Sequence, residues 1–449
     1  MTLDQLKTIF VQAGTKKLYA KPLSENDNSK NQIYFAGAVE ALNVIPSEQI
    51  FAENTSRGPS FKAHLNFGWL LETGEIAPAP SAQLILYSQY PEVRFSGFLK
   101  GCKFGPNQLM VDRGRAKAGS PELIRQLVGR VLFLGITADN RVLGYVAAGD
   151  SDVAAQFNAT NFQPAFVVFR EVPLPNVPME TESRDRLLAE LHRINRLGWI
   201  DSKQLDSDGQ IKPCNAPQCG GFTLEAELGI PKNSDAEPDF LGWEVKQYAV
   251  DDFERIASAR PITMMTPEPD GGFYKDADVE SFVRKFGYAD KTGRPDRLNF
   301  GGRHFLGVRC PPTGLTLQVE GFDITTGHIM DANGCIALVS DAGEVAASWS
   351  FMKILHHWCH KHTKAVYVPS KRKTRPLWQY AYGPKVRLAI GTDSLRLLRA
   401  FASGALYYDP GIKLENVSSE KAKSKKRSQF RVASKNIGEL YESVELVEV

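Results

Sequence analysis

The stretch EPDFLGWEVKQY, residues 237–248, places Asp239, Glu244 and Lys246 within an otherwise apolar segment. Charged side chains are costly to bury unless they are paired or bind a metal ion. Asp239 follows a proline, where the chain can bend and bring its carboxylate beside Glu244. Two carboxylates on one side of a strand suit Mg²⁺, which needs few protein ligands and keeps several waters. We therefore expect a metal site here, with Lys246 beside it.

Residues 241–248 have the length and composition of a buried strand. Side chains alternate between the two faces of a strand. We expect Glu244 and Lys246 to point to one face, and Trp243 and Val245 to point to the other. A salt-bridged strand with no catalytic role is the alternative interpretation of the same residues.

The preceding segment GGFTLEAELGI, residues 220–230, is expected to form a short helix after two glycines, with Thr223 as its cap. Its acidic residue Glu225 is a candidate either to hold Lys246 in place or to help bind a second ion. An ordinary surface helix is the alternative.

Residues 219–248 resemble the active-site region of the MvaI/BcnI restriction endonucleases, a branch of the PD-(D/E)XK nucleases that also includes the mismatch-repair nickase MutH. The matching words are GGFTLEAELGI and PDFLGWEVKQ, together with the 14-residue step from Glu225 to Asp239. The resemblance extends more weakly over about 180–449.

This resemblance implies an α/β fold with the mixed sheet of a PD-(D/E)XK nuclease core. Asp239 and Glu244 would be the metal ligands, with Mg²⁺ as the cofactor. Lys246 would orient the attacking water, and Glu225 would be the supporting acid. The resemblance also implies a short, GC-flanked, pseudo-palindromic target such as CCWGG, a monomer that cuts the two strands in turn, and a cognate DNA methyltransferase as the functional partner.

Length and composition limit the class of protein. At 449 residues the chain exceeds the size at which a single core usually keeps growing, so two or three domains are expected. A net charge of +3 permits a polyanionic partner without requiring one, so an argument for nucleic-acid binding must rest on local clusters. The N-terminal residues lack the pattern of a signal peptide, and no apolar run of about 18 residues occurs, so we expect a cytoplasmic protein without a membrane span. The resemblance implies a prokaryotic source.

Two cysteine and histidine patterns are interpreted without a metal. The close pair Cys214 and Cys219 has no second matching pair, which favours reduced thiols over a disulfide framework or a zinc ribbon. In HHWCHKH, residues 356–362, His356 and His360 would share a helix face. No glutamate stands between them in the metalloprotease arrangement, so we interpret them as polar, partly buried residues at a helix end.

Residues 1–168 are expected to form an all-β domain, a small barrel or sandwich of short strands rich in branched and aromatic residues. Ala138-Asp139-Asn140 is expected to form a hairpin turn. The expected strands are 83–90, 93–99, 130–137, 141–148 and 165–172.

Two stretches of this domain, 17–35 and 90–101, resemble the effector-binding N-terminal domain of EcoRII-type enzymes, a DNA-binding pseudobarrel. The shared words are LS-x-ND, the Gln32 that follows, and an E-x-R triplet. The resemblance implies two DNA-recognition arms, near Ser24–Gln32 and Arg94–Lys100. A β-rich oligomerisation or scaffold module is the alternative. The implied DNA-contacting residues are Asn26, Asp27, Gln32, Arg94 and Lys100.

Proline-rich residues 169–183 interrupt helix and strand, and we expect a linker there. Residues 184–449 should form the α/β catalytic domain, which begins with a helix at 184–197 whose leucines recur at helical spacing. Further expected elements are helices at 345–362 and 393–402 and strands at 241–248, 304–310, 316–323, 335–340 and 365–370.

Positive charge is concentrated in three regions. Residues 361–375 hold six Lys/Arg and no acid, and the cluster at its end should follow a strand, where it can contact phosphates or read guanine. Residues 284–303 carry arginines among glycines, as a flexible clamp would. The segment EKAKSKKRSQFR suits nonspecific phosphate attraction. A solvated loop is the alternative. The candidate DNA contacts are Lys371, Arg372, Lys373, Arg375, Arg294, Arg297 and Arg303.

We therefore expect a Mg²⁺-dependent Type II restriction endonuclease that hydrolyses double-stranded DNA with an activated water and leaves 5′-phosphate and 3′-hydroxyl ends. It would be of Type IIE if the N-terminal domain binds a second, effector copy of the target. A modification-dependent or MutH-like nicking endonuclease is the alternative of the same class. A DNA-binding regulator with a degenerate nuclease fold is the alternative of a different class.

Overall fold

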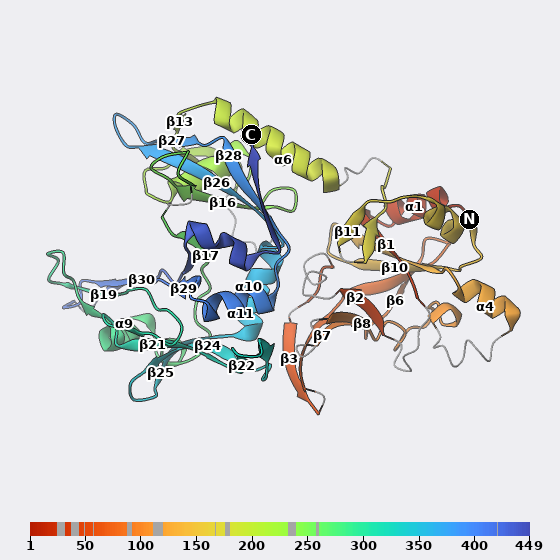
Figure 1. Ribbon diagram of the computed structural model, residues 1–449, viewed down its shortest axis with the longest axis horizontal. Helices are drawn as coiled ribbons and strands as arrows, with labels where there is room; N and C mark the ends of the chain where they lie inside the picture. Colours follow the sequence, from red (N-terminus) through yellow and green to blue (C-terminus); the bar gives the residue numbers. More distant parts are fainter. Residues whose placement is uncertain are drawn as a thin grey trace. The chain divides into compact units, whose positions relative to one another are not determined.

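The structure is a computed structural model in which the chain divides into two compact units, Met1–Asp185 and Arg186–Val449 (Figure 1). Each unit has its own hydrophobic core. The described residues are 1–24, 32–36, 45–48, 50–56, 58–87, 92–110, 120–166, 168–175, 180–231, 239–256, 260–419 and 421–449.

The first unit contains two β-sheets. The larger sheet consists, in spatial order, of β11 (Pro164–Phe166), β12 (Phe169–Glu171), β1 (Thr15–Pro22), β9 (Val131–Thr137), β10 (Val142–Ala147), β5 (Phe67–Leu70) and β6 (Ile76–Pro78). The smaller sheet consists of β2 (Ile33–Ala36), β8 (Glu92–Ser96), β7 (Gln83–Tyr87), β4 (Gly58–His64) and β3 (Ile50–Thr55). The helices are α1 (Leu3–Gln12), α4 (Pro121–Leu127) and α5 (Asp152–Ala159).

Aromatic side chains join the layers of this unit. Phe10 of α1 and Phe157 of α5 pack in one core with Phe133 of β9, so these helices cover one face of the larger sheet. Phe67 of β5 meets Phe95 of β8 with 5.0 Å between ring centroids, which joins the two sheets. The prediction of a β-rich N-terminal part is confirmed. The strand order leaves both sheets open, and no closed barrel is seen among the described residues.

The predicted hairpin turn at 138–140 joins β9 to β10, which pair antiparallel. The Thr137 amide donates a 3.0 Å hydrogen bond to the Arg141 carbonyl and closes the loop. Asn140 has a φ of 60°, a left-handed conformation that asparagine tolerates better than most residues. The turn prediction is therefore confirmed.

The second unit is built around β26 (Lys364–Lys373). Strand β16 (Glu244–Ala249) runs parallel along one edge of β26, with Lys246 opposite Tyr367. Strands β28 (Lys385–Ile390) and β27 (Gln379–Tyr382) pair antiparallel with successive halves of β26. Their pairing overlaps that of β16, so they lie along the other edge. The sheet is completed by β13 (Ile200–Asp201) beside β27 and β33 (Ser443–Glu448) beside β28.

Helices α6 (Glu180–Arg196) and α7 (Cys219–Glu227) cover one face of this sheet. Their apolar side chains share a core with Trp243 and Val245, so these two residues share one face, as predicted, and that face is covered by the helices. Glu244 and Lys246 therefore point to the opposite face. Parallel and antiparallel pairs occur in one sheet, so the predicted mixed α/β fold is confirmed for this unit.

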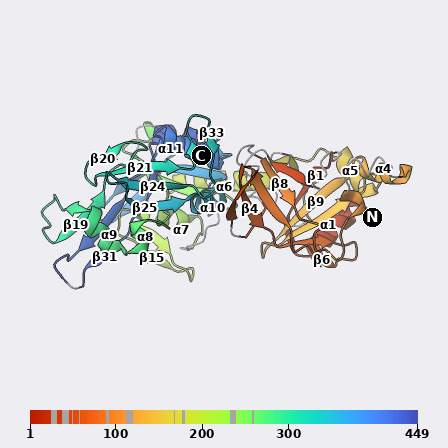
Figure 2. The ribbon, with the colours of Figure 1, turned by 90° about the horizontal axis from the view of Figure 1, so that it is seen from below.

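Smaller sheets and further helices complete the second unit (Figure 2). One sheet consists of β17 (Ile262–Met265), β32 (Phe430–Val432) and β29 (Leu406–Tyr408), and a second consists of β18 (Tyr288–Ala289), β19 (Arg297–Gly301), β30 (Gly411–Glu415) and β31 (Lys423–Lys425). A third consists of β20 (Arg309–Cys310), β21 (Leu315–Glu320), β24 (Cys335–Ser340) and β25 (Val345–Ser350), and two-stranded pairs are formed by β14 (Lys203–Leu205) with β15 (Ile211–Pro213) and by β22 (Phe322–Asp323) with β23 (His328–Ile329). The helices are α8 (Phe273–Asp276), α9 (Val279–Phe286), α10 (Phe351–Lys361) and α11 (Ser394–Ala402).

Three local predictions for this unit are wrong. The helix expected over 345–362 begins at Phe351, because Val345–Ser350 pairs with β24 as a strand. The strand expected over 304–310 is reduced to Arg309–Cys310. Cys214 and Cys219 form a disulfide rather than staying reduced, because the chain entering α7 brings their Cα atoms to 5.8 Å.

None of the helices within the described ranges is both long enough and apolar enough to cross a membrane.

Candidate active site

A tight turn before β16 fixes the position of Asp239. Leu241 and Gly242 at its tip have φ of 49° and 85°, as in a type I′ turn, and the residues on either side exchange two backbone hydrogen bonds. The left-handed conformation costs Leu241 about 1–2 kcal/mol, whereas glycine adopts it freely. The turn folds the chain back, so that Oδ2 of Asp239 accepts a 2.9 Å hydrogen bond from the amide of Val245. The bend predicted at Pro238 lies outside the described residues.

Glu244 and Lys246 form a buried ion pair on the same face of β16. The Lys246 ammonium donates to Oε1 of Glu244 at 2.5 Å. Glu244 is only 2% exposed, and its second oxygen, Oε2, is buried without a hydrogen-bond partner. A carboxylate oxygen left without a partner is costly to bury, so this atom calls for a cation or another donor.

Close packing of α7 against the sheet brings Glu225 near Asp239, Glu244 and Lys246. A Cβ atom on Gly220 would lie 2.9 Å from Oε1 of Gln247 and from the Tyr380 ring, so only glycine allows the helix to approach β16 and β27 this closely. Glu225, one and a half turns later, interacts electrostatically with Asp239 and Lys246.

The predicted cap of α7 is wrong. The helix begins at Cys219, before the two glycines, so Thr223 lies within it. The Thr223 hydroxyl instead accepts from the amide of Lys203 and donates to its carbonyl, both at 3.1 Å. This residue anchors α7 to β14.

The three carboxyl groups have strongly shifted pKa values. Burial, reinforced by Asp239 and Glu244, raises the pKa of Glu225 to about 7. Burial and the charge of Glu244 raise the pKa of Asp239 to about 6. Burial also disfavours ionised Glu244, but electrostatic interaction with Lys246, His362 and Lys361, together with the hydrogen bond from Lys246, outweighs burial and lowers the pKa to about 2. Three acids share two nearby lysines, Lys246 and Lys361, and a divalent cation would relieve the repulsion between the acids.

Two residues near the site were missed by the sequence analysis. His362 is buried and interacts electrostatically with Glu244. Its Nε2–H donates to the carbonyl of Met264 at 3.0 Å, and its Nδ1 accepts from the Tyr441 hydroxyl at 3.1 Å. Lys361, the last residue of α10, lowers the pKa values of Asp239 and Glu244. The sequence analysis interpreted the histidine-rich segment 356–362 as a helix end without a metal. It could not predict the contacts that the last residues of this segment make with distant parts of the chain, because no local sequence pattern indicates them.

The chain's own groups fit a magnesium ion with few protein ligands. Within the described ranges, no group of three or more His, Cys, Asp and Glu side chains is arranged to hold a metal. Two carboxylates suffice for Mg²⁺, which retains several waters, and the partnerless Oε2 of Glu244 is an oxygen ligand of the right kind. The side chains of His356 and His360 lie outside the described part of the chain.

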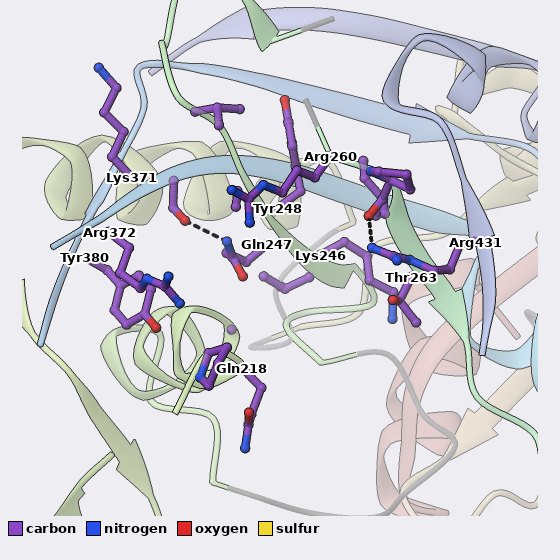
Figure 3. Close-up of a pocket in the computed structure, with 18 of the residues that line it drawn as sticks. Gln218, Lys246, Gln247, Tyr248, Arg260, Thr263, Lys371, Arg372, Tyr380 and Arg431 are labelled. Atoms are coloured by element: carbon purple, nitrogen blue, oxygen red, sulfur yellow. Dashed lines mark hydrogen bonds between the residues drawn. The ribbon is translucent and has the colours of Figure 1, made fainter. Parts of the chain in front are cut away.

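A polar cavity of about 650 Å³ opens beside these residues (Figure 3). Glu225 and Lys246 line it, together with other residues of β16 and with residues of β26. Its positive side chains come from segments far apart in the sequence. Lys371 and Arg372 belong to the first predicted basic region, and Arg427 and Arg431 belong to the predicted basic segment EKAKSKKRSQFR. The sequence analysis missed Arg260.

The predicted basic cluster lies on β26 rather than after it. Its side chains rest on aromatic rings: the Lys371 ammonium is 4.5 Å from the Phe253 centroid and the Lys373 ammonium is 4.7 Å from that of Trp199. Arg375 is exposed in the loop that follows. These cations face solvent beside the cavity, where a polyanion can reach them.

The arginines of the second basic region, residues 284–303, contact other side chains and do not line the cavity. Arg297 is almost buried in an ion pair with Asp290, and it stabilises the β18–β19 turn. Arg294 lies 3.9 Å from Glu415, and the Arg303 guanidinium lies 5.9 Å from the Tyr407 ring. The structure does not bring these three arginines to the cavity lining.

In the first unit, the candidate contacts Asn26 and Asp27 lie outside the described residues. The Gln32 amide donates to the Tyr87 hydroxyl at 3.3 Å, and Arg94 pairs with Glu92 at 2.9 Å. Lys100 is exposed.

A mixed sheet that carries an acid–lysine cluster beside a basic cavity defines a class of α/β proteins suited to phosphodiester chemistry. The model of the MvaI/BcnI restriction endonuclease family matches residues 188–441, more than half of the chain. The chain therefore belongs to the MvaI/BcnI restriction endonuclease family, a family of DNA-cleaving hydrolases.

Two solved structures are similar to this chain. One, described as the restriction endonuclease MvaI–cognate DNA substrate complex, has 16% identity and a TM-score of 0.43, and the match covers 59% of this chain and 98% of that one. The other, MvaI in the absence of DNA, has 15% identity and a TM-score of 0.32 with the same coverage. No curated protein sequence matches the chain.

Proposed function

We propose that this protein is a Mg²⁺-dependent Type II restriction endonuclease with a PD-(D/E)XK site, which hydrolyses both strands of duplex DNA. Family membership supports the reaction class, and the basic cavity supports a polyanionic substrate. The single observation that carries the metal assignment is the buried, partnerless Oε2 of Glu244.

Each residue of the cluster has a proposed role. Asp239 and Glu244 hold Mg²⁺, while the Val245 amide keeps the Asp239 carboxylate in place. When bound, Mg²⁺ acidifies a water and stabilises charge on the phosphate. Lys246 orients the attacking water and offsets charge on the phosphate, since its bond to Glu244 keeps the ammonium at the site. Glu225 supports Lys246 from α7.

The bond changes follow from hydrolysis. The water oxygen forms a bond to phosphorus as the bond from phosphorus to the 3′ oxygen breaks. The 3′ oxygen takes up a proton and leaves as a hydroxyl, and the phosphate stays on the 5′ end.

We further propose a GC-flanked, pseudo-palindromic target such as CCWGG, cut by a monomer one strand at a time and protected in the cell by a cognate methyltransferase. The N-terminal unit would bind a second copy of the target through Gln32, Arg94 and Lys100, which would make the enzyme Type IIE. The exposed Lys100 supports a DNA contact, while Arg94 would first have to release Glu92.

The test is digestion of plasmid DNA of known sequence with Mg²⁺ or with EDTA, followed by mapping of the ends. We expect discrete fragments only with Mg²⁺, and none from Lys246→Ala. The control Lys385→Ala removes a lysine that pairs with Glu254 elsewhere in the unit, and it should cut normally.

The same digestion separates the alternatives. Nicks in one strand, or dependence on methylated or hemimethylated DNA, would replace the proposal by the nickase or the modification-dependent enzyme. DNA binding with no cleavage under any metal would indicate a regulator, and Lys246→Ala would then change nothing.

A further inference from the structure

The loop between β26 and β27, residues 374–378, is an exposed feature that the cleavage mechanism does not use. The register pairs Lys373 with Gln379, so the loop is a short hairpin tip. Residues 374–377 are all exposed, and the tip carries Arg375 and Leu377. The Leu377 side chain is 62% exposed.

We propose that this hairpin tip is a DNA probe: Leu377 inserts as an apolar wedge at a base step flanking the cleavage site, while the neighbouring cations grip the phosphates. The proposal rests on the proposed function, because it needs duplex DNA in the cavity beside β26. Leucine is among the residues that unstack base steps when a basic segment holds them in the minor groove.

The strand register sets the reach of the tip. Lys246 lies opposite Tyr367 on β26, and Lys373 is six residues further along the same strand. At about 3.3 Å per residue, the tip begins about 20 Å beyond the site. The same length spans about six base pairs of duplex DNA at about 3.4 Å each. The tip therefore reaches DNA outside a short target, on a substrate that follows the strand.

The cations at the base of the tip are held ready for phosphates. Lys371 and Lys373 point to one side of β26 and Arg372 to the other, and Figure 3 shows Lys371 and Arg372 leaving the strand in opposite directions. The Arg372 guanidinium lies 5.2 Å from the Trp378 ring, so each of the three cations rests on an aromatic residue. Cation–π contact restrains a side chain without neutralising its charge.

Charge complementarity selects DNA as the occupant of this surface. Within the described ranges, Lys371, Arg372, Lys373 and Arg375 form no salt bridge with a carboxylate, unlike Arg297 with Asp290. Four unneutralised cations around one exposed leucine disfavour an apolar protein partner. They match a ligand with phosphates on the outside and apolar bases inside.

The experiment uses the full chain with Lys246→Ala, so that DNA is bound but not cut. The probe is a 60-base-pair duplex, centred on the cleavage site mapped by plasmid digestion and flanked by alternating A·T pairs. Permanganate oxidises unstacked thymines, and gel shift gives the affinity. We expect a reactive thymine about six base pairs from the cut. Adding Leu377→Ala should abolish that reactivity and weaken binding about tenfold.

Two further variants complete the test. Leu446→Ala is the matched control, since Leu446 is a similarly exposed leucine on β33 (56%) and should leave reactivity and affinity unchanged. Arg375→Ala should reduce the slope of log affinity against log salt by about 0.9, the loss of one phosphate contact.

The outcomes separate the wedge from the nuclease. Specific binding with no reactive thymine, or reactivity that survives Leu377→Ala, would overturn the wedge and leave the proposed function standing. Absence of metal-dependent cleavage by the unmodified chain would remove the proposed function itself.

Discussion

The amide of Val245 donates a 2.9 Å hydrogen bond to Oδ2 of Asp239, so the second residue of β16 holds the acid that precedes the strand. The bond uses one carboxylate oxygen and lowers the pKa of Asp239 against the effect of burial, which nevertheless raises that pKa to about 6. A substitution can therefore remove the charge of residue 239 while it keeps the hydrogen bond that fixes the position of the side chain.

Asp239→Asn should keep the fold and remove cleavage. The asparagine carbonyl can still accept from Val245, but the charge that binds the cation is lost. We expect single-turnover cleavage to fall roughly 100- to 1,000-fold, in the range found when one transition-state contact is removed. DNA binding by gel shift should change little. Asp208→Asn, an exposed residue, is the control, and an active Asp239→Asn enzyme would remove this acid from the mechanism.

Mg²⁺ should stabilise the free protein against heat. A ligand that binds only the folded state at 100 times its Kd adds about 2.7 kcal/mol, which is a rise of a few degrees in Tm. EDTA should reverse the rise. Glu244→Gln should abolish it, because the partnerless Oε2 would no longer carry charge. An equal rise in wild type and Glu244→Gln would place the ion elsewhere.

Adjacent glycines of α7 offer a matched pair of substitutions. Gly220→Ala would press its methyl group against Gln247 and Tyr380, and overpacking of this kind costs about 1–3 kcal/mol. The displaced helix should carry Glu225 away and reduce cleavage. Gly221→Ala meets only Oε1 of Glu225 at 3.8 Å, and it should stabilise the helix by up to about 1 kcal/mol. Denaturant unfolding measures both, and similar losses of stability would contradict the packing described for α7.

Stability should fall in acid because of His304. This residue is fully buried, and burial lowers its pKa from 6.5 to about 4. The unfolded chain binds the proton first, so stability is complete above pH 6.5 and is lost as the pH falls toward 4, by about 3 kcal/mol in total.

His304→Asn should remove the contribution of this residue and so reduce the slope of the unfolding free energy over that pH window, while the contribution of His362, whose pKa burial lowers to about 3, remains. His328→Asn, at an exposed position, should keep the wild-type slope. Equal slopes for wild type and His304→Asn would show that another group controls the acid transition.

Local sequence rules predicted the elements whose signal is local. The periodic leucines located α6, the strand 335–340 was found at its observed bounds, and the turn at 138–140 joins its two strands. Alternation along β16 placed Glu244 and Lys246 on the face opposite Val245. In each case a short run of residues contains the physical cause of the structure.

Contacts between distant segments were not predictable in this way. His362 meets Met264 and Tyr441 across 98 and 79 residues. Pairing of β17 with β32 brings Arg260 and Arg431 to the cavity, and no local sequence pattern predicts this pairing. Helix α10 begins at Phe351, later in the sequence than predicted, because the residues before it form β25 and pair with β24. Tertiary pairing therefore overrides local helix propensity there.

The measurement that tests the central claim most directly is anomalous diffraction from crystals of the full chain soaked in Mn²⁺, a substitute for Mg²⁺. We predict one strong peak between the carboxylates of Asp239 and Glu244, with Oε2 of Glu244 among its ligands. No peak there, with Glu244 bound only to Lys246 at full soaking concentration, would contradict the assignment of this cluster as the metal site of a nuclease.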